Sequence, residues 1–407
     1  MSSGSNLYRI FILGAGFSRP AGLPLAAELW EEVRHRAGRL SGRAAQFRGD
    51  LDTYIEFRRD CDGITLTPEE VDFEDFLGFL DIEHHLGLRG SDTWSRDGNE
   101  AQVVVKTLIG QVLAEATPAP DRIPDLYIRF AEGLQPNDYV LTFNYDVLLE
   151  RALEAIQKPF RLFPQRLQNV RPTGAEVDTS REEVILLKLH GSMDWFDRAQ
   201  YGELEAQWRE QGLDSGPPHP VFRNTTELQV LPLLEGPRFP NDPLREMHRV
   251  RRIEALYRRP ILFHCTPWLL NPSSAKMLYS GALRDFWYGM GDAGALNFGL
   301  AIIGFSLPPQ DDYARQVLYR IVKNYQESYW DEEVFDRKKS PLVLVDARKS
   351  KEQKDELEKR YAFVDWTKAS VYMNGFDDDA IDLLFGGSFG ARSLTRRSKR
   401  RPRAGRA

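Results

Sequence analysis

The sequence has little cysteine and no long apolar segment, and both shortages limit what the protein can be. Cys61 and Cys265 are the two cysteines in 407 residues, too few for a disulfide framework or a four-cysteine zinc site. We find no apolar run long enough to span a bilayer, and residues 1–6 lack the basic and apolar stretches of a secretory signal. We therefore expect a soluble protein of the reducing cytoplasm with no membrane contact.

The body of the chain has a surplus of acidic residues, whereas its end has no acid. The net formal charge is −6, and residues 392–407 hold eight Arg or Lys residues, so residues 1–391 carry −14. An acidic body argues against a broad nucleic-acid-binding surface. Contact with nucleic acid or an acidic partner would therefore involve the basic tail, whose alternative role is that of a disordered, solubilising end.

Short apolar runs alternate with amphipathic stretches over most of the chain. We expect strands at residues 7–13, 138–143, 183–189, 260–265, 297–304 and 341–346. We expect helices from Pro24, at residues 145–156, 273–290 and 311–329, and in the charged segment that ends at Tyr361. This alternation predicts an α/β fold, a Rossmann-like parallel sheet with helices on both faces.

The expected domain organisation follows from where this alternation stops. Residues 50–117 have a helical period and no confident strand, which predicts a helical insertion. The Rossmann-like core would then comprise residues 1–49 and 118–375, and residues 376–407 would form a C-terminal extension that includes the basic tail. Residues 197–245 are rich in proline, glycine and acids, so we expect long loops or an excursion from the core there.

A glycine-rich motif follows the first expected strand. It consists of Gly14, Ala15, Gly16, Phe17 and Ser18, with Gly22 and Pro24 further on. A loop between a strand and a helix presents backbone N–H groups to an anion, and glycine lets the backbone approach a diphosphate closely. The third glycine comes too late for a G-x-G-x-x-G pattern, so an ordinary tight turn remains the alternative.

Polar residues also follow two later strands. Thr142, Asn144 and Asp146 end one strand, where open α/β sheets hold their ligands. His190 ends the next strand and would act as a general base near neutral pH. The alternatives are that Asn144 or Asp146 caps the following helix, and that His190 is a buried histidine bonded to the backbone.

Two further strand ends carry candidate ligand contacts. Gly304 and Ser306 follow the strand expected at residues 297–304, and the Ser306 hydroxyl would bond to a phosphate or a ribose. Asp346 ends the last expected strand and would reach an adenosine ribose. A turn that caps the next helix is the alternative at Ser306. Because several strand ends carry such residues, we predict that they form one crevice.

Taken in order along the chain, these motifs resemble those of the sirtuin superfamily. The segment GAGFSRPAGLP at residues 14–24 is similar to the sirtuin glycine-alanine-glycine-x-serine loop with its later glycine-x-proline. Asn144 and Asp146 resemble the asparagine-x-aspartate step, and His190 resembles the catalytic histidine of a histidine-glycine pair. Residues 304–307 look like the late glycine-x-serine-leucine turn. The resemblance spans most of the chain, and the shared order makes it specific.

Two departures separate the chain from sirtuin deacylases. Deacylases usually carry a four-cysteine zinc module after the histidine, whereas this chain has the single Cys265 there. After the segment that matches residues 22–24, deacylases continue with aspartate, phenylalanine and arginine, where this chain has Leu25, Ala26 and Ala27. In both respects the chain resembles the sirtuin-like domains of bacterial antiviral defence, which hydrolyse NAD⁺.

The resemblance implies an NAD⁺ glycohydrolase that releases nicotinamide and ADP-ribose and depletes NAD⁺ in antiphage defence. It assigns Asn144 to the nicotinamide ribose or the attacking water, His190 to a ribose hydroxyl or that water as base, and Asp146 to the nicotinamide amide. The other implied contacts to the dinucleotide are Gly14, Ala15, Gly16, Phe17, Ser18, Thr142, Gly304, Ser306 and Asp346. NAD⁺ is the substrate, and neither zinc nor another cofactor is expected.

The resemblance also implies partners, and two other functions stay open. Proteins of this branch often form large homo-oligomers, and some work beside a HerA-type DNA translocase or an Argonaute-like protein. The first alternative function is an NAD-dependent protein deacylase. The second is a non-catalytic NAD⁺ or ADP-ribose sensor, which would keep the glycine loop and Ser306 but would not need His190.

Overall fold

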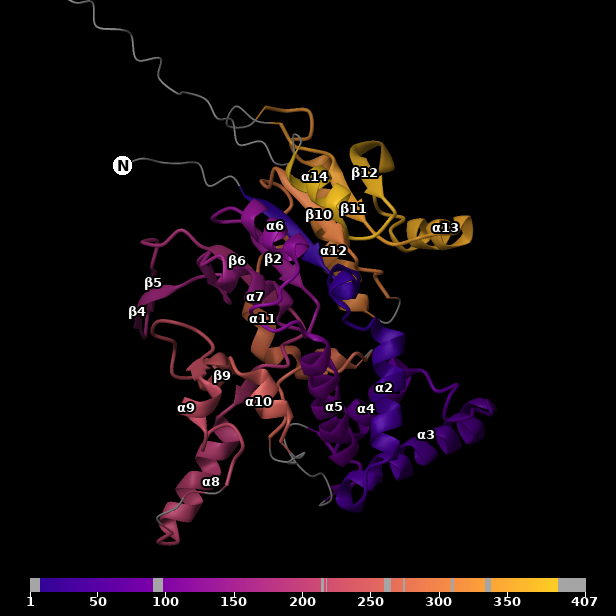
Figure 1. The fold of residues 1–407 in the computed structure, drawn as a ribbon, viewed down its shortest axis with the longest axis vertical. Helices are drawn as coiled ribbons and strands as arrows, with labels where there is room; N and C mark the ends of the chain where they lie inside the picture. The colour runs from indigo at the N-terminus through magenta and orange to yellow at the C-terminus, as the bar shows by residue number, and fades with distance from the viewer. Residues whose placement is uncertain are drawn as a thin grey trace, which may run out of the picture.

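The core of the molecule is a seven-stranded parallel sheet (Figure 1). The computed structural model describes residues 8–90, 98–213, 216, 218–259, 265–273, 275–308, 311–333 and 338–386. Across the sheet the strands are β12 (Ala369–Tyr372), β11 (Leu342–Val345), β10 (Gly299–Ile303), β1 (Arg9–Leu13), β2 (Tyr139–Thr142), β6 (Val184–Lys188) and β3 (Phe160–Arg161). This order confirms the predicted Rossmann-like parallel sheet.

The strand order reverses direction at β1, and this point organises the molecule. The chain leaves β1 for β2 on one side, whereas β10 pairs with the other side of β1. Leu13, the last residue of β1, is in register with Thr142 of β2 and Ile303 of β10. The three strands therefore end together, and open α/β sheets bind ligands outside the carboxyl ends of strands at such a reversal.

Helices lie around the sheet and bury its apolar strands (Figure 1). They are α6 (Asp125–Gly133), α7 (Leu148–Ala155), α12 (Asp312–Glu327), α13 (Lys351–Arg360) and α14 (Asp378–Phe385). Phe11 of β1 packs against Phe130 of α6 at 5.7 Å and against Phe385 of α14 at 5.8 Å between ring centroids. The start of the expected C-terminal extension is thus packed on the core, while the basic tail lies outside the described residues.

Four helices between β1 and β2 form a second part of the molecule, away from the sheet (Figure 1). They are α2 (Ala26–Gly38), α3 (Gln46–Asp62), α4 (Phe73–His85) and α5 (Glu100–Ala116). Asp81 of α4 ties this part to a later loop, because its carboxylate accepts hydrogen bonds from Gln102 at 2.7 Å, Asn271 at 2.6 Å and the Ser273 hydroxyl. The helical period at residues 50–117 therefore corresponds to helices in the structure.

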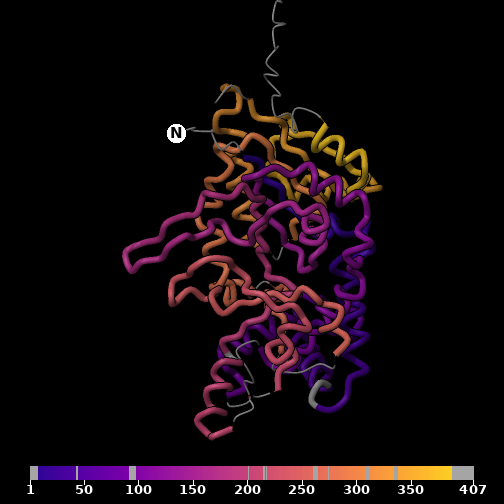
Figure 2. The backbone as a smooth tube through the Cα atoms, turned by 60° about the vertical axis from the view of Figure 1, so that its left-hand side comes forward, coloured from indigo at the N-terminus to yellow at the C-terminus, as the bar shows by residue number. Residues whose placement is uncertain are grey.

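The segment 197–245 forms an excursion from the main sheet with helices and strands of its own, and not long loops alone. It contains α8 (Ala199–Glu210), α9 (Thr225–Leu228) and η4 (Pro243–Glu246), and β8 (Val230–Pro232) pairs with β9 (Met247–Val250), which in turn pairs with β7 (Trp195–Asp197). Helix-forming Ala, Glu and Gln residues dominate α8, although proline and glycine surround it. A hairpin of β4 (Leu167–Arg171) and β5 (Gly174–Val177) projects from the side (Figure 2).

Two expected elements need correction, and one lies outside the described residues. Residues 273–290 do not form one amphipathic helix but η5 (Lys276–Leu283) and α11 (Arg284–Trp287), and Gly289 then turns the backbone at φ +72°. Helix α7 begins at Leu148, because the Asp146 carboxylate accepts from the Leu148 amide at 3.0 Å. The strand expected at residues 260–265 falls almost wholly outside the described residues.

Within the described residues, we find no helix that combines the length and the apolar composition needed to cross a membrane.

Candidate functional site

The glycine-rich loop after β1 lies directly on the loop after β10. The Gly14 amide donates to the Ile303 carbonyl at 3.0 Å, and the Gly16 amide donates to the Gly304 carbonyl at 2.9 Å. A Cβ atom on Gly16 would lie 2.7 Å from the Gly304 Cα, and one on Gly304 would lie 2.3 Å from the Phe17 amide nitrogen. The glycines therefore allow two backbones to touch, a role that the sequence pattern did not predict.

Three predicted site residues form one hydrogen-bonded cluster beside this contact. The Ser18 hydroxyl donates to Asp146 at 2.8 Å, and the Asn144 side chain donates to the Gly14 carbonyl at 3.0 Å and to the Ser18 hydroxyl at 3.1 Å. Thr142 supports the cluster, because its hydroxyl accepts from the Asn144 amide at 3.1 Å. Residues from the ends of β1 and β2 thus meet, as predicted, and Asp146 also accepts from the Leu148 amide at the start of α7.

His190 is buried at the end of β6, next to this cluster. Its ring lies 5.0 Å from the Phe143 ring and 6.2 Å from the Tyr145 ring, so both neighbours of Asn144 contact it. Its Nε2 atom contacts the Tyr313 hydroxyl. Burial, and then the positive charge of Lys276, hold the pKa of His190 well below its usual value of 6.5. The imidazole is therefore neutral at neutral pH, the form that a general base requires.

Aromatic side chains enclose the histidine. Phe143 stacks on Phe305 with ring centroids 4.2 Å apart, and Trp287 packs edge-on against Tyr313 at 5.2 Å. Burial raises the pKa of Tyr313, so its hydroxyl keeps its proton. The sequence did not predict these aromatic contacts, because Trp287 and Tyr313 lie in stretches with an ordinary amphipathic pattern. They exclude water, and so strengthen the electrostatic interactions of the polar groups that they cover.

A buried group of charges lies behind Tyr313. Lys276 of η5 forms an ion pair with Asp311, the residue before α12, and both side chains are nearly inaccessible to solvent. The Lys276 ammonium lies 5.8 Å from the centroid of the Tyr313 ring. Burial raises the pKa of Asp311 against the opposing charge of Lys276, and burial raises the pKa of Glu74 of α4 to about 7. These charges were also absent from the prediction.

The remaining predicted contacts are placed differently. Phe17 is buried and packs on Phe376 at 4.7 Å, so its side chain belongs to the core and not to the site. Ser306 is half-buried after β10, and its carbonyl accepts from the Arg360 guanidinium at 3.3 Å. Asp346 is bound within its own loop, because it accepts from the Ala347 amide at 2.6 Å and pairs with a neighbouring arginine. Ala15 begins the short helix α1 (Ala15–Ser18).

No three His, Cys, Asp or Glu side chains are grouped so as to hold a metal ion in the part of the chain that the structure describes. Cys61 is exposed and Cys265 is buried, and the two do not form a disulfide with each other.

Comparisons with known proteins give one family match and several similar solved structures. A family model described as a SIR2-like domain matches residues 138–206, which include Asn144, Asp146 and His190. The chain is similar to a structure of Sir2Tm bound to a propionylated peptide, with 11% identity, a TM-score of 0.31 and 94% of each chain covered. It is also similar to a structure of Sir2 with the inhibitor EX-527, 2′-O-acetyl-ADP-ribose and a deacetylated p53 peptide, with 10% identity, a TM-score of 0.31 and coverage of 94% of this chain and 95% of the other.

A third structure, described as the structural basis of sirtuin substrate affinity, has 12% identity, a TM-score of 0.31 and 93% of each chain covered. A comparison with curated proteins gives no match. The chain thus contains a SIR2-like segment, and that segment carries the asparagine, the aspartate and the histidine of the candidate site.

Proposed function

We propose that the protein is an NAD⁺ glycohydrolase, which cleaves NAD⁺ to nicotinamide and ADP-ribose. One observation carries the proposal. Ser18, Asn144 and Asp146 are joined by hydrogen bonds at the strand reversal of the sheet, and a neutral, buried His190 lies beside them. The amide, carboxylate and imidazole groups follow the ends of neighbouring strands, where such sheets bind dinucleotides, and we propose that one NAD⁺ contacts all three.

The reaction needs little chemistry beyond positioning. The bond between ribose C1′ and the nicotinamide nitrogen breaks, and its electron pair neutralises the positive charge on the nicotinamide ring. A water oxygen then bonds to C1′, and its proton passes to a base. We assign Asn144 to the ribose or the water, His190 to the proton, and Asp146 to the nicotinamide amide. Fixed groups in a site from which water is excluded stabilise the cationic ribose of the transition state.

The ribose or the attacking water must contact His190 before the imidazole can accept a proton. Its Nε2 atom contacts the Tyr313 hydroxyl, so the ribose or the water must share or replace this contact. The Gly14 and Gly16 amides donate to carbonyls of the protein, so we assign the diphosphate to the amide of Ala15 and the hydroxyl of Ser306. We keep Asp346 for the adenosine ribose. No metal and no cofactor besides NAD⁺ enters this scheme.

The test is to incubate the purified protein with NAD⁺ and to separate the products by chromatography. We expect Asn144→Ala and His190→Ala each to reduce nicotinamide release by about a hundredfold or more, a typical cost of losing a positioned catalytic group. His35→Ala, on the exposed surface of α2, is the matched control and should keep full turnover. Full nicotinamide release by the folded Asn144 and His190 variants would refute the assignment.

The same experiment separates the two alternatives. With NAD⁺ and an acetylated peptide, a protein deacylase makes O-acetyl-ADP-ribose, whereas a hydrolase makes ADP-ribose whether or not the peptide is present. A sensor binds NAD⁺ tightly in calorimetry and releases no nicotinamide. We rank both alternatives lower, because the chain lacks the cysteines of a zinc module and has both Asn144 and His190 in place.

We also propose a setting for this activity, which rests on the resemblance to sirtuin-like defence proteins. The enzyme would deplete NAD⁺ in the cytoplasm of an infected bacterial cell. It would act as a homo-oligomer, with a HerA-type DNA translocase or an Argonaute-like protein as its partner. The measurement is cellular NAD⁺ after phage infection. NAD⁺ should fall in cells that express the wild-type protein and stay constant in cells that express His190→Ala.

A further inference from the structure

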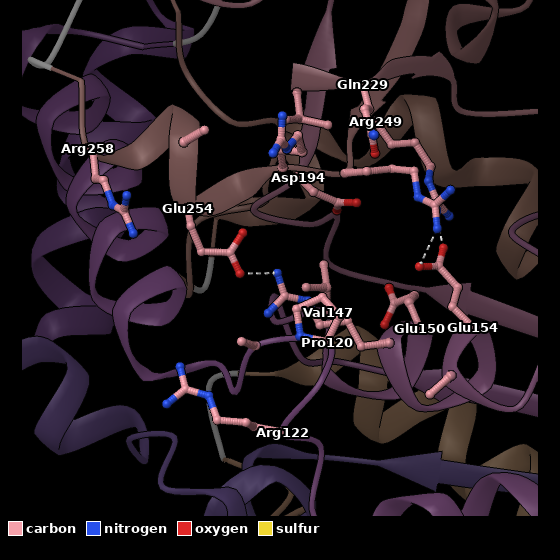
Figure 3. Close-up of a pocket in the computed structure, with 17 residues that line it drawn as sticks. Pro120, Arg122, Val147, Glu150, Glu154, Asp194, Gln229, Arg249, Glu254 and Arg258 are labelled. Carbon is pink, nitrogen blue, oxygen red and sulfur yellow. Dashed lines mark hydrogen bonds and ion pairs between the residues drawn. The ribbon is translucent and has the colours of Figure 1, made fainter. Parts of the chain in front are cut away.

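A cavity of about 680 Å³ lies between α7, the small sheet of β7, β8 and β9, and α10 (Ile253–Tyr257) (Figure 3). Its walls hold four carboxylates and six arginine side chains, namely Arg122, Arg151, Arg249, Arg251, Arg252 and Arg258. Neither the glycine loop nor His190 lines it. The cavity is therefore distinct from the candidate active site, and its volume falls in the range of small-molecule sites.

The arginines outnumber the acids that neutralise them. Glu154 pairs with Arg249 at 2.5 Å and with Arg251 at 2.8 Å, and Glu254 pairs with Arg151 at 2.6 Å. A third acid, Glu150, forms an ion pair with Lys188, with 2.8 Å between Oε1 and Nζ.

The positive charges of three arginines in the cavity are available to a ligand. Among the described residues, Arg122, Arg252 and Arg258 form no ion pair with a carboxylate, and all three are exposed to solvent. Figure 3 shows Arg122 and Arg258 on the same side of the cavity. The planar guanidinium group binds phosphate oxygens through paired hydrogen bonds, so these residues fit a phosphorylated ligand.

A buried acceptor faces the same space. Asp194 is 6% exposed, and its Oδ1 atom is buried without a hydrogen-bond partner. In Figure 3 its carboxylate points toward the middle of the cavity. An unsatisfied buried carboxylate oxygen costs free energy, and a ligand with an O–H or N–H donor would remove that cost. The cavity thus combines cations for phosphate with an acceptor for a hydroxyl or amino group.

We infer that this cavity binds a phosphorylated nucleotide. The phosphates lie on Arg122, Arg252 and Arg258, and a ribose hydroxyl or a base amino group donates to Asp194. Inorganic diphosphate alone would leave Asp194 unsatisfied, because it carries no donor at neutral pH that could face a carboxylate without repulsion.

The cavity lies behind both loops of the candidate active site. Val147, which follows Asp146, lines it, and so does Asp194, which lies four residues after His190. Lys188 connects the two places, because its ammonium donates to the Asp146 carbonyl and pairs with Glu150. The nucleotide therefore acts as an effector and not as the substrate. This effect rests on the proposed function, whereas binding itself does not.

The test measures binding of ADP to the full-length protein by calorimetry. The double variant Arg122→Glu/Arg258→Glu reverses two exposed charges and should weaken ADP binding by at least about tenfold, and Arg209→Glu on the exposed face of α8 should not. Binding should also weaken as salt is added. An ADP affinity that the double variant leaves unchanged would place ADP elsewhere and overturn the proposal, whatever the result for nicotinamide release.

A second variant tests the acceptor. Asp194→Ala should weaken binding of ADP by about tenfold and should not weaken binding of pyrophosphate, because only ADP has the donor that Asp194 accepts. Adenosine, which lacks phosphate, should bind at least tenfold more weakly than ADP. Pyrophosphate that binds as tightly as ADP, or an ADP affinity that Asp194→Ala does not change, would overturn the assignment of a nucleotide.

Discussion

The chemistry of the candidate site depends on the environment of single residues. The sequence predicts Asn144, Asp146 and His190 as site residues, because parallel strands end at one edge and these residues follow two strand ends. It could not identify the neutral state of His190, which arises from burial and from Lys276 in a distant segment. It also could not identify Tyr313, whose position in a helical pattern looks like that of a core residue.

The pH dependence of turnover should report this environment. A general base works in its deprotonated form, and the pKa of His190 is lowered, so the acid limb of kcat/KM should fall below pH 6.5. Lys276→Gln removes a positive charge that lowers this pKa, so the limb should move to higher pH. The measurement is nicotinamide release between pH 5 and 8, with the exposed Lys351→Gln as control. An acid limb at the same pH in the Lys276→Gln variant would contradict this electrostatic role.

At the scale of elements, the contact between the loops after β1 and β10 fixes the site. Gly16 and Gly304 meet backbone to backbone, and this contact places Ser18 within reach of Asn144 and Asp146. Gly304 also has φ +62°, a conformation that favours glycine over other residues. Both steric space and backbone conformation therefore require glycine at position 304.

Replacing this glycine should destabilise the fold. In Gly304→Ala the new Cβ would lie 2.3 Å from the Phe17 nitrogen at a positive φ, so we expect a loss of about 2–4 kcal/mol in the free energy of unfolding. Gly38→Ala is the control, because a Cβ at the end of α2 meets nothing within 4 Å. It should change stability by less than about 1 kcal/mol. Urea denaturation measures the free energy of unfolding of both variants. Equal losses in Gly304→Ala and Gly38→Ala would show that the backbone contact at Gly304 is not tight.

The elements also show where sequence patterns reach their limit. The buried strands β1, β2, β6, β10 and β11 were predictable, because each is a continuous apolar run between turns. The edge strands β3 and β12 were not, because one has two residues and the other is only partly buried. The apolar positions of residues 273–290 fit a helical period, yet the segment folds as short 3₁₀ and α turns around the buried Lys276.

At the scale of the whole molecule, one carboxylate joins the helical part to the site. Asp81 of α4 is fully buried and accepts from Gln102 of α5 and from Asn271 and Ser273 of the loop that precedes Lys276. The helices between β1 and β2 are thus connected to the residues that set the charge near His190. Nothing in the helical period of residues 50–117 reveals this connection.

Removing the carboxylate should loosen the connection. Asp81→Ala leaves three buried donors without their acceptor, so we expect a loss of about 2–5 kcal/mol in the free energy of unfolding. The rate of amide hydrogen exchange should rise more in α4 and α5 than in β1. Asp52→Ala, at an exposed position of α3, should have little effect. If α4 and α5 stay protected in a folded Asp81→Ala protein, the carboxylate is not the link.

Helix α7 starts immediately after the turn at residues 144–146, and its flank forms part of the wall of the arginine-lined cavity. The helix has 8 residues and is about 12 Å long, so the cavity wall lies close to the turn. A ligand in the cavity would therefore contact the helix at whose N-terminal end Asp146 accepts from Ser18. A ligand in the cavity would then influence the candidate active site without occupying it.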